Sequence, residues 1–186
     1  MPMQKSKRNK TFFHIYWGNG RGKTSCAAGT LIRDYFHFPN KNYLWIQFFK
    51  KGPLYSGETA FLYQNLKNLE FYSVISELNI WEYKNISKNL IKIRKSFQDF
   101  WQNKEKFTEK IYQLIILDEF LDVFKYNLLD ISESIMWLTR LKANDIIITG
   151  HEKVEKLFEI GNYITYFKME KHPYIKYIRA RKGIEF

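Results

Sequence analysis

Short apolar runs alternate along the chain with longer stretches in which apolar residues recur at helical spacing. The runs occupy residues 12–17, 43–49, 70–74, 114–118 and 146–149 and are rich in Phe, Tyr, Trp, Ile and Leu. Apolar runs of this length, closed by glycine, proline or charged residues, are typical of strands buried on both faces, as in a parallel sheet. We therefore predict a strand at each run, the one at 70–74 being the weakest.

Helical periodicity fills the intervals between these runs. Residues 87–107 carry Leu, Ile, Phe and Trp side chains at the spacing of one helix face. Another helix is predicted to begin after Asp130, which together with Glu133 resembles a capping box. This alternation predicts an α/β fold, with a mostly parallel sheet flanked by helices. The chain contains no repeat and no linker, so we predict one domain over residues 11–186 that follows a basic arm at residues 1–10.

The segment at residues 17–25 carries the first chemical signal. It has the sequence Trp-Gly-Asn-Gly-Arg-Gly-Lys-Thr-Ser and lies between a predicted strand and residues 26–32, which resemble the first turns of a helix. Alternate glycines let backbone N–H groups converge on an anion, and the helix N-terminus adds roughly half a positive charge. Lys23 would contact the phosphates and the Thr24 hydroxyl a bound Mg²⁺, whereas a chance glycine turn would not have these flanks. The nucleotide-binding candidates are Gly18, Asn19, Gly20, Arg21, Gly22, Lys23, Thr24 and Ser25.

The glycine spacing departs from that of the common phosphate loop. The common pattern places four residues between its first glycine and the Gly-Lys pair. Here three residues separate Gly18 from Gly22, and Trp17 stands where the first glycine belongs. We therefore predict a P-loop NTPase-like fold of RecA-like type, in a subgroup distinct from generic ATPases.

Two carboxylates follow one another at the end of the apolar run at residues 114–118. A parallel strand delivers such residues, here Asp118 and Glu119, to the sheet edge where ligands bind. Mg²⁺ favours a few carboxylate oxygens and retains waters. Many strands end in acids, but the combination with the glycine loop predicts a joint nucleotide–Mg²⁺ site. The predicted metal ligands are Thr24, Asp118 and Glu119, and the predicted catalytic residues are Lys23, Thr24 and Glu119.

Composition narrows the remaining classes of protein. The chain has 186 residues, of which 45% are hydrophobic, and this predicts a folded globule. No apolar run approaches the roughly 18 residues of a membrane span. The single cysteine, Cys26, excludes an internal disulfide and favours a reducing cytoplasm. No Ser/His/Asp triad and no Cys/His cluster with metal-ligand spacing occurs, so no protein nucleophile is indicated.

The formal net charge of +11 invites a nucleic-acid interpretation. The lysines are scattered, however, and only the arm concentrates basic residues, at Lys5, Lys7, Arg8 and Lys10. A solvated tail is the default interpretation of this run. An arm that closes over an anionic ligand or partner is the second, and nucleic-acid binding is the least favoured.

Four blocks of residues, in order and at compatible spacing, give the chain a resemblance to a known family. They are Gly18-Asn19-Gly20-Arg21-Gly22-Lys23-Thr24; Gln47-Phe48-Phe49-Lys50-Lys51-Gly52 followed by Gly57-Glu58; Leu117-Asp118-Glu119; and Thr149-Gly150 followed by Lys171-His172-Pro173 and Gly183-Ile184-Glu185-Phe186. The chain resembles the corrinoid adenosyltransferases of the P-loop type, which attach the adenosyl group of ATP to cobalt. The resemblance extends over residues 11–186, and the glycine-alternating loop is itself the family's form.

The resemblance implies a substitution at carbon, in which a Co(I) corrinoid attacks the 5′ carbon of ATP and triphosphate leaves. The protein would position the reactants and stabilise the leaving charge. ATP with Mg²⁺ or Mn²⁺ is the implied co-substrate and the corrinoid the acceptor. Arg33 matches a family arginine that contacts the nucleotide, and Trp81 matches an aromatic residue of the corrinoid side. A cytoplasmic homodimer is also implied, with the basic arm covering the nucleotide site and a flavoprotein reductase as electron donor for cobalamin biosynthesis.

Three positions depart from the family's pattern. Asn79 stands where the family has a phenylalanine that helps to remove the lower cobalt ligand, His151 stands in place of an arginine, and Tyr177 in place of a glycine. The nucleotide half of the site therefore matches better than the corrinoid half. Two alternatives stay open: a divergent relative without corrinoid activity, and a P-loop ATPase or nucleic-acid-associated protein.

Overall fold

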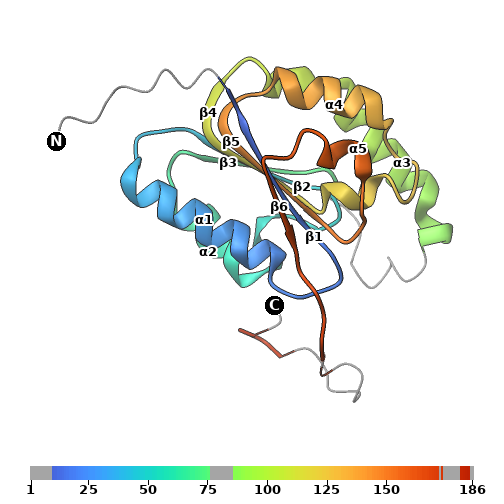
Figure 1. Ribbon diagram of the computed structural model, residues 1–186, viewed down its shortest axis with the longest axis horizontal. Helices are drawn as coiled ribbons and strands as arrows, with labels where there is room; N and C mark the ends of the chain where they lie inside the picture. Colours follow the sequence, from blue (N-terminus) through green and yellow to red (C-terminus); the bar gives the residue numbers. More distant parts are fainter. Residues whose placement is uncertain (1–9, 76–85, 172, 174–180, 185–186) are drawn as a thin grey trace.

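The computed structural model describes residues 10–75, 86–171, 173 and 181–184, which contain a six-stranded sheet in the order β3-β2-β4-β5-β1-β6. All pairs of neighbouring strands in this sheet are parallel. The strands are β1 (Phe12–Trp17), β2 (Tyr43–Gln47), β3 (Leu69–Ser73), β4 (Ile111–Asp118), β5 (Lys142–Gly150) and β6 (Tyr163–Tyr166). The predicted α/β fold, a parallel sheet flanked by helices, is confirmed (Figure 1).

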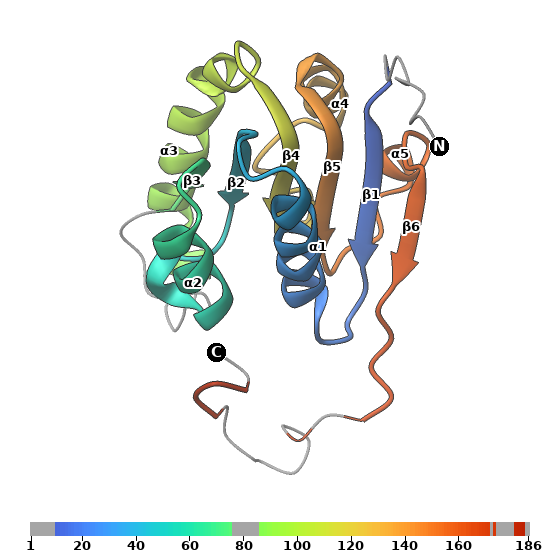
Figure 2. The same ribbon diagram turned by 90° about the vertical axis from the view of Figure 1, so that its left-hand side faces the viewer.

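Helices cover both faces of the sheet, as Figure 1 and Figure 2 show. One face carries α1 (Lys23–His37) and α2 (Gly57–Asn65), and the other carries α3 (Ile86–Gln102) and α4 (Ile131–Arg140). The described residues also form α5 (Glu155–Phe158) and the 3₁₀ turns η1 (Pro53–Tyr55), η3 (Lys104–Phe107) and η4 (Phe120–Val123). Within this part of the chain, no helix combines the length and the apolar character that a membrane crossing requires.

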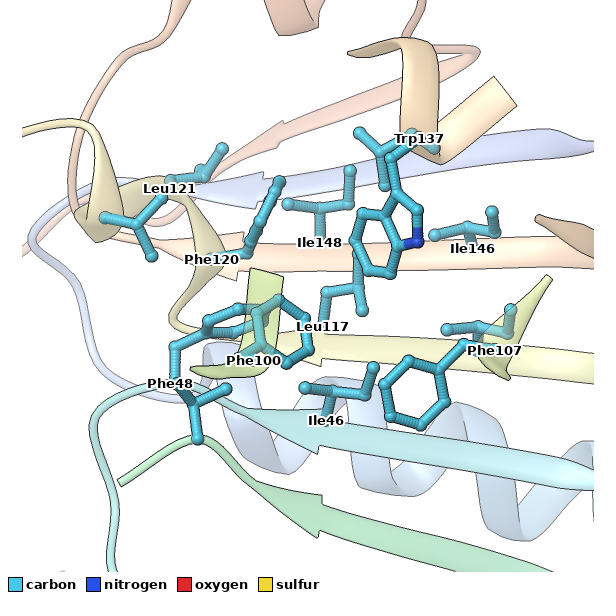
Figure 3. Close-up of a cluster of buried hydrophobic side chains, with 14 of the residues drawn as sticks. Ile46, Phe48, Phe100, Phe107, Leu117, Phe120, Leu121, Trp137, Ile146 and Ile148 are labelled. Carbon is cyan, nitrogen blue, oxygen red and sulfur yellow. The ribbon is translucent and has the colours of Figure 1, made fainter. Parts of the chain in front are cut away.

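The core between the sheet and the α3–α4 layer is rich in aromatic side chains (Figure 3). The rings of Phe48 and Phe120 lie 4.9 Å apart between centroids, and Phe100 meets Trp137 edge-on at 5.8 Å. Large aromatic rings thus fill much of the space between the layers. On the opposite face α1 presents the buried Ala27 among larger side chains, which lets this helix approach the strands closely.

The strand bounds differ from the apolar runs where backbone pairing or a turn overrides hydrophobicity. β1 has the predicted bounds, whereas β4 and β5 begin earlier, with Ile111 of β4 opposite Lys142 of β5. A strand between two neighbours continues to pair beyond its buried residues. β2 ends at Gln47, although Phe48 and Phe49 after it remain buried. The chain turns there because the Gln47 side-chain amide donates to two backbone carbonyls of the following residues.

Some elements had no signal in the apolar pattern. All four residues of the edge strand β6 are exposed, so no buried run marks it. α2 has only Thr59 and Leu62 fully buried, too few for a recognisable stripe. The helix predicted over 87–107 ends at Gln102, and the chain continues after Asn103 as η3.

The carboxyl ends of the strands meet at one edge of the sheet, the lower edge in Figure 2. There β1 leads into residues 18–22 and then into α1, while β4 ends at Asp118. The described part of the chain after β6 leaves from the same edge (Figure 2). Ligands of open parallel sheets bind at this kind of edge, and the chemical groups predicted from the sequence gather here.

Candidate functional site

The loop between β1 and α1 has the backbone shape of an anion-binding turn. Gly22 is the N-cap of α1 and has a φ of 102° and a ψ of 0°, in the left-handed region that favours glycine. Lys23 and Thr24 are the first two residues of the helix. The positive end of the helix dipole therefore lies at the loop, where unpaired N–H groups attract negative charge.

The close approach of the chain after β6 explains why the loop has glycine at positions 18 and 20. A Cβ atom on Gly18 or on Gly20 would lie 2.6 Å from the carbonyl oxygen of Phe167. The Gly20 N–H donates to that oxygen at 2.6 Å, and the Phe167 N–H donates to the backbone carbonyl oxygen of Trp17 at 2.8 Å. The Met169 N–H donates to the Asn19 side chain at 3.0 Å. The unusual alternation of glycines thus matches a close approach of two backbones, residues 17–20 and 167–169.

Lys23 folds back over the loop. Its ammonium donates to the carbonyl oxygens of Gly18 at 2.7 Å and Gly20 at 2.8 Å, and the side chain is buried. Burial lowers the pKa of this ammonium, although the carboxylates of Asp122 and Glu119 oppose the shift. The lysine therefore sits above the loop in the position from which it could transfer its hydrogen bonds to a phosphate.

Asp118 lies beneath the loop and organises it. Its side chain is fully buried and accepts hydrogen bonds from the hydroxyls of Thr24 at 2.9 Å and Thr149 at 2.8 Å. Its other oxygen accepts from the Lys50 ammonium at 2.7 Å. Buried carboxylates are stable only with such partners, so Asp118 ties the start of α1 and the ends of β4 and β5 into one polar cluster.

Glu119 follows Asp118 directly at the end of β4 and is partly exposed. Its φ is 64°, an uncommon value for a residue other than glycine, and its N–H donates to the Thr149 hydroxyl at 2.9 Å. Burial raises the pKa of the Glu119 carboxyl; the Lys50 ammonium, 3.6 Å away, opposes the rise and the Asp118 charge adds to it. Burial alone would lower the pKa of Lys50, but the Asp118 and Glu119 charges together raise it above its usual range.

The oxygens of Thr24, Asp118 and Glu119 fit the chemistry of a Mg²⁺ site. All of them are hard oxygen donors, as Mg²⁺ prefers, and the Thr24 and Asp118 oxygens are 2.9 Å apart. Among the described residues no group of three or more His, Cys, Asp or Glu side chains could hold a metal. With a nucleotide, Mg²⁺ usually takes one or two protein ligands and completes its shell with waters and phosphate oxygens, and the oxygens named above suit that arrangement.

A cavity of about 310 Å³ opens over this cluster. The structure brings most of the predicted site residues to its wall: Asn19, Gly20, Arg21, Gly22, Lys23, Thr24, Ser25 and Glu119. Gly18 and Asp118 lie behind the wall rather than on it. The same wall contains residues for which we predicted no role: Lys50, Ser56, Glu58, Thr149, His151 and Ile184. Most of these belong to the blocks that carry the resemblance, and that was their only signal.

The rim of the cavity is held by side-chain contacts from distant segments. The Ser25 hydroxyl donates to the Glu58 carboxylate at 2.7 Å. Burial raises the pKa of Glu58, whereas hydrogen bonds from Ser25, from its own backbone and from Ser56 lower it. The lowering is the larger effect, so the net shift of the pKa is downward. The Arg21 guanidinium donates to the Ile184 carbonyl, which brings the described end of the chain to the loop.

Of the other predicted site residues, one lines a different cavity and one lies outside the described part of the chain. Arg33 lines a second cavity of about 210 Å³, together with His14, Asp34 and Asp145. Trp81 lies outside the described residues, as do Asn79, His172 and Tyr177 and residues 1–9 of the basic arm. Cys26 is exposed, and it does not line the loop cavity.

Strand, glycine loop, helix N-terminus with Lys23 and Thr24, and an acidic strand end beside them define a protein of the P-loop class. The strand β5 separates the loop strand β1 from the acidic strand β4. A family model described as ATP:corrinoid adenosyltransferase BtuR/CobO/CobP matches residues 9–186, and the protein belongs to this family.

Curated relatives agree with the family model at low identity. The chain is 24% identical to a corrinoid adenosyltransferase of Sinorhizobium sp over 171 residues, which are 91% of this chain and 77% of the relative. It is 25% identical to a corrinoid adenosyltransferase of Pseudomonas aeruginosa, over 92% of this chain and 82% of the relative. For the corrinoid adenosyltransferase CobA of Salmonella typhimurium the identity is 26%, over 92% and 84%. Among solved structures, domain III of the Thermotoga maritima replication initiation protein DnaA aligns with a TM-score of 0.42 and 16% identity, covering 88% of this chain and 57% of that one.

Proposed function

We propose that the protein transfers the 5′-deoxyadenosyl group of ATP to the Co(I) centre of a corrinoid, with release of triphosphate. The observation that carries the proposal is the cavity built from the glycine loop, Lys23 and the Asp118 cluster, in a chain of this family. In this reaction the C5′–O bond breaks and triphosphate leaves with the electron pair. The Co–C bond forms with two electrons from cobalt, which is oxidised formally from Co(I) to Co(III).

The site is suited to stabilising the leaving group rather than to attacking the substrate. The loop N–H groups, the start of α1 and the Lys23 ammonium place positive charge where triphosphate would bind. The described residues of the cavity wall include no cysteine. A reaction in which the acceptor itself is the nucleophile needs no more than this positioning.

Mg²⁺ or Mn²⁺ would be held by Thr24 and Glu119, with Asp118 behind them. When bound, the metal would neutralise charge on the triphosphate as the bond to carbon breaks. Thr24 would contribute its hydroxyl and Glu119 its carboxylate, while Asp118 would keep the Thr24 hydroxyl oriented.

The proposal extends to partners on the basis of the family. We infer a cytoplasmic homodimer in which the basic arm at residues 1–10 covers the nucleotide site, and a flavoprotein that reduces the corrinoid. Light scattering would give the oligomeric state. Deletion of residues 1–9 should weaken ATP binding if the arm contributes to the site.

The experiment that tests the reaction is anaerobic. Purified protein, Mg-ATP and a chemically reduced Co(I) corrinoid are mixed, and the visible spectrum is followed beside a reaction without protein. We expect decay of the Co(I) band into a light-sensitive adenosyl-corrinoid spectrum, with one triphosphate per product. ADP and phosphate as products would instead favour a P-loop ATPase, and a flat trace despite ATP binding would favour a relative without corrinoid activity, as the departure at Asn79 suggests.

A further inference from the structure

Lys50 occupies the place in the site where a cation is expected. Its ammonium lies 2.7 Å from an oxygen of Asp118, 3.1 Å from the Thr24 hydroxyl oxygen and 3.6 Å from an oxygen of Glu119. These are the three oxygen donors that fit Mg²⁺. Only 14% of the Lys50 side chain is exposed, so the ammonium is held by these groups rather than by water.

An ammonium group and a divalent cation cannot bind the same oxygen atoms at the same time. The two positive charges would repel each other at close range in a site that is largely shielded from water. Both Thr24 and Asp118 are hydrogen-bonded to Lys50, so a metal must displace the lysine to reach them.

The surroundings allow Lys50 to move while its backbone stays in place. The Gln47 side-chain amide donates to the backbone carbonyls of Lys50 at 2.9 Å and Gly52 at 2.7 Å, and the Gly52 N–H donates to the Ser73 hydroxyl at 3.1 Å. The lysine stem is flexible and it lines the cavity beside Lys23. A displaced ammonium would therefore point into the space that a triphosphate fills.

We propose that Lys50 is the resident counter-charge of the metal site, which a divalent cation entering with the nucleotide displaces onto the phosphates. The metal part of this inference stands on the Lys50 contacts alone, and the phosphate part rests on the proposed function. Without nucleotide, divalent cations bind weakly because Lys50 holds their ligands. Triphosphate offers Lys50 a new partner, so metal and nucleotide bind together.

Mn²⁺ provides a direct probe of the metal part. Mn²⁺ binding is followed by electron paramagnetic resonance, without nucleotide, for the wild-type protein and for Lys50→Met, Lys50→Gln and Lys51→Met. Lys51 is the matched control, because it is the adjacent lysine and is exposed. We expect at least about tenfold tighter Mn²⁺ binding in both Lys50 variants and no change in Lys51→Met. Unchanged affinity in Lys50→Gln would overturn the proposal.

Lys50→Gln keeps the test decisive if Lys50→Met does not fold. Glutamine is slightly shorter than lysine, but it keeps a hydrogen-bond donor and lacks the charge. The Lys50→Arg variant, which keeps the charge, should bind Mn²⁺ as weakly as the wild type. Thermal melts give a second readout: Mn²⁺ should raise the Tm of Lys50→Gln more than that of the wild type. An equal rise in both proteins would count against the proposal.

Inorganic triphosphate tests the phosphate part. In the presence of saturating Mn²⁺, Lys50→Gln should bind triphosphate about tenfold more weakly than Lys51→Gln, because it lacks the displaced ammonium. Equal affinity in the two variants would overturn this part. Neither measurement requires a corrinoid or turnover, so a failure of adenosyl transfer and a failure of the Lys50 proposal are distinguishable.

Discussion

Two cavities lie along the helix α1, and both have basic and acidic side chains in their walls. The loop cavity lies at the carboxyl ends of the strands, at the start of α1, whereas the Arg33 cavity lies beside the second half of α1. At the second cavity, His14 contacts Asp145 at 2.9 Å and stacks on Tyr163, and Asp34 accepts a hydrogen bond from Tyr43 at 2.8 Å. Basic side chains alone do not make a phosphate site; the backbone of the loop and the helix start make the difference.

The largest effect on this contrast is expected from Lys23→Ala. The variant loses the ammonium that would contact the phosphates, so ATP affinity should fall by at least about a hundredfold. Isothermal titration calorimetry measures the affinity, with the exposed Lys41→Ala as the matched lysine control. Circular dichroism should show a folded protein. Undiminished ATP binding in a folded Lys23→Ala variant would refute the assignment of the loop.

Gly20→Ala should produce the next largest effect. Its Cβ would lie 2.6 Å from backbone atoms of Phe167, so the loop or the following chain must shift. We expect ATP affinity to fall about tenfold, in line with the usual cost of overpacking. Gly29→Ala is the control, because nothing lies within 4 Å of its Cβ position and alanine favours the helix. If both variants bound ATP like the wild type, the contact with Phe167 would not shape the loop.

Glu58→Gln tests the rim of the loop cavity through pH. The folded-state pKa of Glu58 is lowered from its ordinary value of 4.5, so its stabilising contribution is present above that pH and is lost as pH falls through the folded pKa. The variant should therefore be less stable than the wild type near neutral pH, by less than about 1 kcal/mol, since the site is partly exposed. Urea unfolding between about pH 6 and about pH 3 should show the difference disappearing in acid. If the stability difference between the two proteins did not change with pH, the negative charge of Glu58 would not be its cause.

Arg33→Ala should have the smallest effect. The family resemblance implies a nucleotide contact for this arginine, but the structure places it at the second cavity, away from the loop. We expect ATP affinity within about twofold of the wild type, because the cavity at Arg33 and the loop cavity share no wall residues. A tenfold loss would show that the second cavity takes part in nucleotide binding and would weaken the contrast drawn above.

The sequence predicted best those parts that local chemistry determines. β1 has its predicted bounds, and the helix start predicted at Asp130 is confirmed, since the Asp130 carboxylate accepts from the Glu133 N–H at 2.9 Å. The loop residues predicted to act together line one cavity, because a strand, a glycine turn and a helix follow one another along the chain. Local signals of this kind survive in any compatible fold.

Contacts between distant segments were beyond prediction from the pattern. Lys50 lies 68 residues from Asp118 in sequence, and nothing in its neighbourhood marks it as the partner of a buried carboxylate. β6 is an exposed edge strand, and its pairing with β1 depends on a close approach that only the fold provides. The role of Gly20 in accommodating Phe167 depends on the same approach.

The contact between the glycine loop and the chain after β6 also has a consequence for biosynthesis. The Met169 N–H and the Asn19 side chain that accepts it are 150 residues apart in sequence. β1 is flanked in the sheet by β5 and β6, so both of its neighbours are translated long after it. A ribosome therefore completes the glycine motif early, yet the loop acquires its closing contacts only when residues 163–169 have emerged. Until then the nascent chain contains the glycine motif but not the contacts that complete the loop. A chain that ended before residue 163 would have a recognisable P-loop sequence but would lack these contacts.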